Sequence, residues 1–252
     1  MAGLDPILLV IAAAITLFAG VVKGAVGFAM PMVMISGLAS IMPAEQALAA
    51  LIVPTLATNG IQALRQGRAA AWQSIVEYRR MLITLSLTIL ASAQLVPYIP
   101  QTLLLIVLGL PIVAFALSQL AGWQLRFHAD NRARAEITAG VVGGFFGGIS
   151  GVWGPPTIAL LLSLDAGKSE SVRVQGVVYL IGAAILAVAH LASGVLNAST
   201  LPLSLILTLP GVVGLFIGFA IHDRLDQARF RRWTLVVLVV TGLNLLRRAL
   251  LT

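Results

Sequence analysis

The chain has 252 residues, of which 59% are hydrophobic and only 10% are charged, against about 25% charged residues in a typical soluble domain. So much apolar side chain cannot be hidden in one soluble core of this size, which excludes an ordinary cytoplasmic globule and a disordered chain. The formal net charge of +7 comes mostly from basic residues in short loops between apolar runs, a pattern that indicates a membrane protein and not a nucleic-acid-binding protein. The chain has no cysteine, so disulfides and Cys-ligated metals are also excluded.

Ten apolar segments, separated by polar residues, glycine or proline, divide the chain. In chain order they cover residues 6–25, 30–42, 44–64, 80–97, 102–122, 134–150, 155–165, 170–193, 201–221 and 230–249. A membrane-spanning helix needs about 20 residues, a length that several of these segments reach. The segments 30–42 and 155–165 are too short to cross and are predicted to be half-helices or re-entrant pieces. The first segment is expected to be retained, because no positively charged leader or cleavage site precedes it.

An internal repeat connects the two parts of the chain. Four landmarks recur at one offset of 124 residues, namely Gly20, Gly24, Gly27 and Pro31 and their counterparts Gly144, Gly148, Gly151 and Pro155. The repeat predicts a duplication, with a first membrane repeat at 1–122, a cytoplasmic linker at 123–133 and a second repeat at 134–252. Five segments per repeat is an odd number, so the second repeat should lie inverted relative to the first. The predicted fold is an all-α polytopic membrane protein with two inverted-topology repeats, whose broken half-helices meet at the midplane.

The positions of the basic residues support this topology. If the loop at 65–80 faces the cytoplasm, parity places the loops near 122–134, 165–173 and 221–232 on the same side. Thirteen of the 16 basic residues lie in these four loops, namely Arg65, Arg68, Arg79, Arg80, Arg126, Arg132, Arg134, Lys168, Arg173, Arg224, Arg229, Arg231 and Arg232. Arg247 and Arg248 are exceptions, and Lys23 lies within the membrane. The excess of positive charge inside predicts a multi-pass protein of the bacterial cytoplasmic (inner) membrane.

The two helix breaks carry the candidate chemistry. Each has a glycine, Gly27 or Gly151, followed by a proline, Pro31 or Pro155, that suits the first turn of a new helix. The free N–H groups and positive dipole ends of two short helices would then face each other across the midplane. Such an arrangement predicts an anion site built mostly from backbone. The alternative is that the glycines only allow close helix packing.

Lys23 is the sharpest single candidate, because a charged residue inside the membrane is costly unless it is paired or hydrated. A substrate-facing lysine would select an anion, whereas the alternative is that Lys23 snorkels to a membrane face. Uncharged donors at helical spacing should line the same cavity, with interhelical hydrogen bonding as their alternative role. Phe28 and Trp153 flank the breaks and either wall the site or only pack. The predicted substrate-binding residues are Lys23, Gly24, Gly27, Phe28, Thr55, Asn59, Gly151, Trp153, Gly154, Gln175 and Tyr179.

These motifs resemble the TauE/SafE family of sulfite exporter-like membrane proteins. The run Ala19–Phe28 followed by Pro31 is similar to the first family signature, and Gly143–Gly151 followed by Pro155 is similar to the second. The Gln66-Gly67-Arg68 turn also fits. The family often has three consecutive glycines after each signature, which this chain lacks, and Lys23 matches only some members. The resemblance implies transport of small sulfur-containing anions such as sulfite or sulfonates, often outward.

We therefore predict a secondary transporter that exports small anions, such as sulfite or sulfoacetate, by alternating access. Expected partners are the anion, the lipid bilayer and a second copy of the chain in a homodimer. For the energy source two alternatives stay open, a coupling proton carried by a residue such as Glu45 or Glu170, and uniport without a coupling ion. No cofactor, metal, nucleic acid or enzymatic activity is expected. One alternative is an intramembrane serine protease that pairs Ser150 with His190, although a structural role for His190 is the simpler interpretation. The other is an accessory membrane protein that transports nothing.

Overall fold

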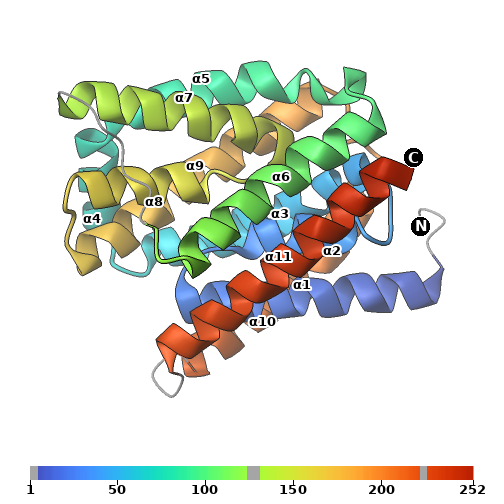
Figure 1. Ribbon diagram of the computed structural model, residues 1–252. Helices are drawn as coiled ribbons and strands as arrows, with labels where there is room; N and C mark the ends of the chain where they lie inside the picture. The colour runs from blue at the N-terminus through green and yellow to red at the C-terminus, as the bar shows by residue number, and fades with distance from the viewer. Residues whose placement is uncertain (1–4, 124–130, 222–225, 252) are drawn as a thin grey trace.

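The computed structural model describes residues 5–123, 131–221 and 226–251 of the chain, and within them every regular element is a helix (Figure 1). The order is α1 (Pro6–Val26), α2 (Met30–Leu38), α3 (Ala44–Leu64), α4 (Arg68–Glu77), α5 (Arg79–Ala93), the short 3-10 helix η1 (Val96–Tyr98), α6 (Gln101–Leu120), α7 (Arg132–Ser150), α8 (Gly154–Ser163), α9 (Lys168–Ala192), α10 (Leu201–Ile221) and α11 (Gln227–Leu251). Each of the ten predicted apolar segments forms a helix. The all-α prediction is confirmed.

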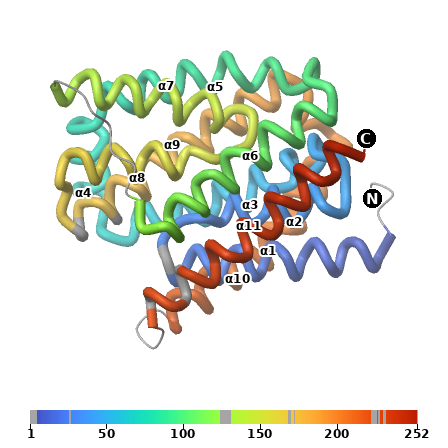
Figure 2. Tube along the Cα trace, viewed as in Figure 1, coloured from blue at the N-terminus to red at the C-terminus, as the bar shows by residue number. Residues whose placement is uncertain are grey.

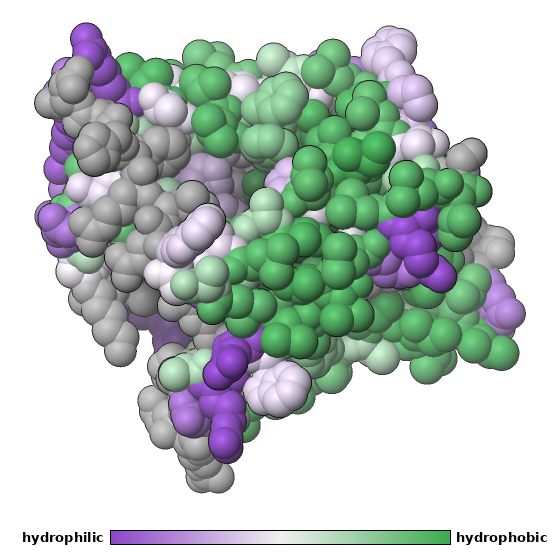
Figure 3. Space-filling view, in the orientation of Figure 1, coloured by the Kyte–Doolittle hydropathy of each residue, from purple (hydrophilic) through white to green (hydrophobic). Residues whose placement is uncertain are grey.

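Seven helices in the described part of the chain are long and apolar enough to cross a membrane. Figure 3 shows the corresponding surface, where apolar side chains cover the face formed by α6 and α11. The chain is therefore a multi-pass membrane protein. The nine residues of α2 and the ten of α8 are too few to cross, as predicted. α7 is not among the seven candidates, because its glycines and the charged residues of its first turn lower its hydropathy.

Two helices, α3 and α9, form the centre of the molecule and pack against each other. They are 61% and 56% buried over their apolar stretches, whereas the other candidate spans are 33–44% buried. Around them lie three close helix pairs, α1 with α10, α5 with α7, and α6 with α11 (Figure 2). The short helices α2 and α8 each follow a long glycine-rich helix and lead back to the central pair. Side chains of α3 and α9 therefore lie next to the two helix breaks.

Glycines set the closest of these contacts. A Cβ atom added at Gly24 of α1 would overlap the Leu215 carbonyl oxygen of α10. A Cβ atom added at Gly148 of α7 would overlap the Ser92 hydroxyl of α5. The two glycine helices are thus held in equivalent ways, each against a helix from the other predicted repeat. The boundaries of the repeats and their inverted orientation remain predictions.

The prediction of a loop at 65–80 is wrong in one respect, because most of this stretch forms the helix α4. Gly67, with φ +91°, forms the predicted turn before it. At the other end of α4, the hydroxyl of the buried Tyr78 donates a 2.7 Å hydrogen bond to the Glu170 carboxylate of α9. Burial and this hydrogen bond both raise the pKa of Tyr78. This contact with α9 supplies tertiary packing that a short helix needs and that periodicity alone does not reveal.

Ionic contacts tie the start of α7 to the same region. Arg132 donates hydrogen bonds to the carboxylates of Glu136, at 2.7 Å, and Glu77, at 3.2 Å. The contact with the buried Glu136 raises the pKa of Arg132. Of the predicted cytoplasmic arginines, Arg126 and Arg224 lie outside the described residues, as does most of the predicted linker at 123–133.

Candidate functional site

The two predicted helix breaks have the same backbone design. α1 ends at Gly27, whose φ of +84° is left-handed and whose N–H donates a 2.7 Å hydrogen bond to the Lys23 carbonyl oxygen. α7 ends at Gly151, with φ +71° and a 2.7 Å bond to the Gly147 carbonyl oxygen. Glycine adopts this conformation at little cost, which explains why both helices end there. Both positions match the offset of 124 residues.

Each short helix begins where the sequence predicts, at Met30 for α2 and at Gly154 for α8. The backbone offers fewer donors at these ends than the sequence argument assumed. Proline has no N–H, so Pro31 removes one donor from the first turn of α2, and Pro155 and Pro156 remove two from α8. An anion site at this place must therefore depend more on side chains.

A small cavity lies between the two breaks. Its volume is about 20 Å³, which suits one water molecule. Seven of the eleven predicted substrate-binding residues line it, namely Lys23, Phe28, Asn59, Gly151, Trp153, Gly154 and Tyr179. The structure thus brings together residues from four separate helices and both breaks.

A chain of hydrogen bonds links three helices across this cavity. The Lys23 ammonium of α1 donates to the side-chain oxygen of Asn59 on α3. The Asn59 amide nitrogen in turn donates a 2.8 Å bond to the Tyr179 carbonyl oxygen of α9. This second bond orients the Asn59 side chain so that its oxygen faces Lys23. Both side chains are only 1% exposed.

The charge of Lys23 has no counter-charge in the described part of the chain. None of the ion pairs found there includes Lys23, and Asn59 is a neutral partner. An ammonium group has three donors, and this hydrogen bond uses one. The burial also excludes the alternative in which Lys23 snorkels to a membrane face. A buried cation without a carboxylate nearby is an unfavourable arrangement that a bound anion would relieve.

Four predicted residues do not line the cavity. Gly24 contacts α10, in keeping with the packing alternative, and Gly27 accepts a 3.0 Å hydrogen bond from the Gln62 side chain through its carbonyl oxygen. Thr55 is fully buried, one turn before Asn59, and its hydroxyl has no hydrogen-bond partner. Gln175 lies one turn before Tyr179 and accepts a long 3.5 Å bond from its hydroxyl.

The two aromatic residues wall the cavity and also pack. Trp153 is 2% exposed, and its ring lies against the Cα positions of Gly147 and Gly182, where a Cβ atom would come within 2.9 and 3.1 Å of it. Phe28 contacts Phe115 of α6 edge-to-face, with ring centroids 6.4 Å apart. The sequence did not decide between a wall role and a packing role, and both residues have both roles in the structure.

Sequence reasoning missed the rest of the cavity wall. Ala29, Met30, Pro31, Met32 and Val152 also line it. The sequence analysis used Pro31 only to mark the start of a helix. Because this start lies at the break, the residues next to Pro31 could have been predicted to line the cavity as well. The conformation of Ala29, a non-glycine residue with φ +75°, leaves no trace in the sequence. Such strained residues cluster at functional sites.

The residues of the protease alternative do not form a catalytic pair. The Ser150 hydroxyl donates a 2.6 Å bond to the Phe146 carbonyl oxygen. The buried His190 ring contacts the Gly148 carbonyl oxygen at 2.9 Å and the Ser193 hydroxyl at 3.1 Å. Both ring nitrogens are engaged without Ser150, so a nucleophile activated by this histidine is not formed. The simpler structural interpretation of His190 fits these contacts.

The two carboxylates considered for proton coupling lie away from the cavity. Glu45 is exposed in the first turn of α3. Glu170 accepts the hydrogen bond from Tyr78 at the start of α9. Neither carboxylate lines the space around Lys23.

A multi-pass helical membrane protein with broken helices around a buried cation has the features of a secondary transporter. Comparison with known families gives a specific assignment, because the family model of the sulfite exporter TauE/SafE matches residues 12–245. The chain belongs to this family of membrane transporters, as its sequence motifs suggest. No curated protein and no solved structure matches the chain significantly.

Proposed function

We propose that the protein is a secondary transporter that exports small sulfur-containing anions, such as sulfite or sulfonates, across the bacterial cytoplasmic membrane. The observation that carries the proposal is the Lys23 ammonium, buried beside Asn59 without an acidic partner. An oxyanion would supply the missing negative charge and accept the remaining ammonium hydrogens. The family supports the same class of substrate.

The proposed mechanism is alternating access around the Lys23 cavity. With a volume of about 20 Å³, the cavity has to widen before it can hold an oxyanion. The two breaks are natural places for this movement, since each interrupts the helix ladder beside the cavity. Opening toward one side and then the other would move the anion across the membrane. Coupling to a proton and assembly as a homodimer belong to the same proposal.

The test is flux of labelled sulfite into proteoliposomes of the purified protein, with sulfonates as competitors and with or without a pH gradient. We expect saturable flux in the wild type and a loss of about 10- to 100-fold in Lys23→Ala, since a charge-assisted hydrogen bond contributes roughly 1.5–3 kcal/mol. Arg68→Ala is the control, because it removes one positive charge at an exposed position outside the cavity.

Two results would contradict the proposal. One is the absence of flux for any anion when the protein is shown to be folded. The other is an equal loss in Lys23→Ala and Arg68→Ala, which would mean that net charge matters and the cavity does not. Dependence of the flux on the pH gradient decides the question of proton coupling.

A further inference from the structure

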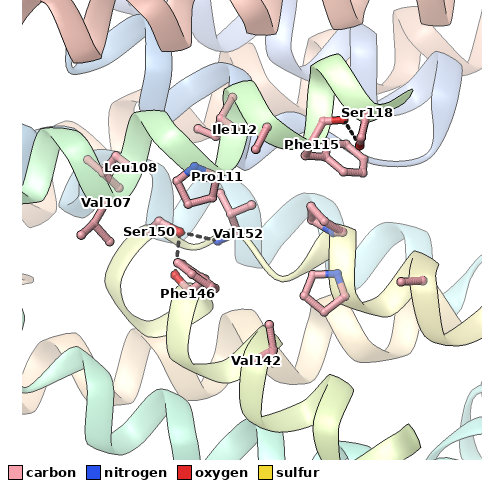
Figure 4. Close-up of a pocket in the computed structure, with 14 residues that line it drawn as sticks. Val107, Leu108, Pro111, Ile112, Phe115, Ser118, Val142, Phe146, Ser150 and Val152 are labelled. Atoms are coloured by element: carbon pink, nitrogen blue, oxygen red, sulfur yellow. Dashed lines mark hydrogen bonds between the residues drawn. The ribbon is translucent and has the colours of Figure 1, made fainter. Parts of the chain in front are cut away.

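Two further cavities follow one another along α6 and α8. The first has a volume of about 330 Å³ and lies between α6 on one side and α7 and α8 on the other (Figure 4). The second has a volume of about 570 Å³ and lies between the end of α6, α8 and the start of α11. Ser118 and Ala159 line the first cavity, and their chain neighbours Gln119 and Ile158 line the second. The two cavities therefore adjoin, and both have the volume of small-molecule sites.

The first cavity is apolar and opens toward lipid. Leu108 and similar side chains form most of its wall, and the exposed Ala114 and Val142 lie at its mouth. The hydroxyl groups of Ser118 and Ser150 donate hydrogen bonds of 2.8 and 2.6 Å to backbone carbonyl oxygens of their own helices (Figure 4). Because α6 is a candidate membrane span, this cavity lies at the depth of the lipid acyl chains. It therefore suits a hydrocarbon chain better than water.

The second cavity carries a cationic group. Arg232 of α11 lines it, and none of the described residues around it is acidic. The ion pairs found in the described part of the chain do not include Arg232. Its guanidinium group is exposed and thus has no counter-charge there. A guanidinium fork in this setting suits the oxygens of a phosphate group.

Exposed tryptophans place the second cavity at the depth of the lipid headgroups. Trp123, which lines this cavity, is 72% exposed, and Trp233, next to Arg232 in the chain, is 65% exposed. Tryptophan is enriched at the interface between membrane and water, where its ring meets lipid and its N–H meets water. This end of α11 also belongs to the predicted cytoplasmic side, where anionic lipids attract basic residues. An apolar cavity at acyl-chain depth thus leads to a cationic cavity at headgroup depth.

We infer that the two cavities together bind one anionic phospholipid. The phosphate of its headgroup binds at Arg232, and one acyl chain occupies the apolar cavity between α6, α7 and α8. A zwitterionic phospholipid has the same chains, but the ammonium group of its headgroup offsets the charge of the phosphate. It should therefore bind less tightly than an anionic lipid with the same chains.

The experiment is native mass spectrometry of the purified protein, freed of copurified lipid, with added phosphatidylglycerol or phosphatidylcholine. With dioleoyl chains on both, we expect one phosphatidylglycerol per protein chain, bound about fivefold more tightly than phosphatidylcholine, which is the contribution of roughly one basic residue near anionic lipid. Dihexanoyl phosphatidylglycerol should bind more weakly, because a short chain leaves much of the apolar cavity unfilled.

Four variants separate the site from the general lipid shell. Arg232→Gln should weaken phosphatidylglycerol binding about fivefold and leave phosphatidylcholine binding unchanged. Arg247→Gln removes an exposed arginine at the opposite end of the same helix and should behave as the wild type. Ala114→Phe fills the mouth of the apolar cavity and should weaken both lipids, whereas Ala91→Phe, at an exposed position of α5 outside both cavities, should not. Ala159→Leu fills the cavity from α8 and serves if Ala114→Phe does not fold.

Three results would overturn the inference. The first is equal binding of the two dioleoyl lipids by the wild type. The second is an equal loss in Arg232→Gln and Arg247→Gln, which is the behaviour of lipid that surrounds the protein without a specific site. The third is unchanged binding in folded Ala114→Phe and Ala159→Leu, because the acyl chain would then lie elsewhere. None of these measurements uses anion flux, so their failure would leave the proposed function intact.

Discussion

At the first break the chain leaves α1 at Gly27 and enters α2 at Met30, and at the second it leaves α7 at Gly151 and enters α8 at Gly154. The backbone caps are alike, with left-handed glycines and 2.7 Å bonds to the carbonyl oxygen four residues earlier. Apart from the equivalent prolines Pro31 and Pro155, the side chains differ. The two breaks thus share a backbone conformation that ends a helix, while a buried charged side chain lies at the first of them.

The difference is clearest one turn before each glycine. Lys23 in the first break brings a buried positive charge to Asn59, whereas its counterpart Gly147 leaves space for the Trp153 ring. Two residues after each glycine, Ala29 has φ +75° and Trp153 has φ −110°. The first break is thus charged and strained, and the second is neutral and relaxed.

The largest expected effect would come from giving the first break an internal counter-charge. Asn59→Asp places a carboxylate beside Lys23, so an anion would have to compete with an ion pair inside the cavity. We expect sulfite flux in proteoliposomes to fall about 100-fold or more while the protein stays folded.

Asn59→Ser is the control, since it removes the amide without adding charge and should reduce flux much less. Flux in Asn59→Asp equal to that of the wild type would show that the Lys23 charge does not meet the anion, and the contrast between the two breaks would lose its functional meaning.

A smaller effect concerns the glycines that hold the two break helices. At Gly24 an added Cβ would overlap backbone atoms of α10, which cannot move independently. At Gly148 the closest atom is the Ser92 hydroxyl oxygen, which can rotate away, although the Ile89 carbonyl oxygen follows at 2.8 Å. We expect Gly24→Ala to lower the free energy of unfolding by about 3 kcal/mol and Gly148→Ala by about half as much.

Thermal unfolding in detergent measures both variants. Adding Ser92→Ala to Gly148→Ala should recover part of the loss, and the double-mutant cycle isolates this coupling. If Gly24→Ala and Gly148→Ala lose the same free energy of unfolding and Ser92→Ala recovers none of it, the contact of α1 with α10 and that of α7 with α5 are equally rigid.

The smallest expected effect tests the strain at Ala29. A left-handed conformation costs a non-glycine residue about 1–2 kcal/mol, so Ala29→Gly should raise the free energy of unfolding by roughly 0.5–1 kcal/mol. Ala12→Gly, at a fully buried helical position of α1, should lower it by about 1 kcal/mol. Thermal unfolding measures both changes. A more stable Ala29→Gly variant beside a less stable Ala12→Gly variant supports strain at Ala29, and a loss of stability in both variants would contradict it.

Much of the fold and part of the site could be read from the sequence. Long apolar runs set the spanning helices, and the repeated Gly–Pro pattern located both breaks to within a residue. Lys23, Asn59 and Tyr179 could be predicted because the sequence alone reveals a charged residue inside an apolar segment and polar residues at helical spacing. Gly24 shows the limit of that approach, since a glycine beside a site and a glycine in a helix contact look the same in a sequence.

The sequence alone determined the membrane class, the helical segments and the residues that could meet at the breaks, because hydropathy and backbone chemistry are local properties. Only the tertiary structure decided which residues meet. It placed Asn59 between Lys23 and the Tyr179 carbonyl oxygen and left Lys23 without a carboxylate in the described part of the chain. These features depend on how separate helices pack, and packing is a property of the assembled molecule.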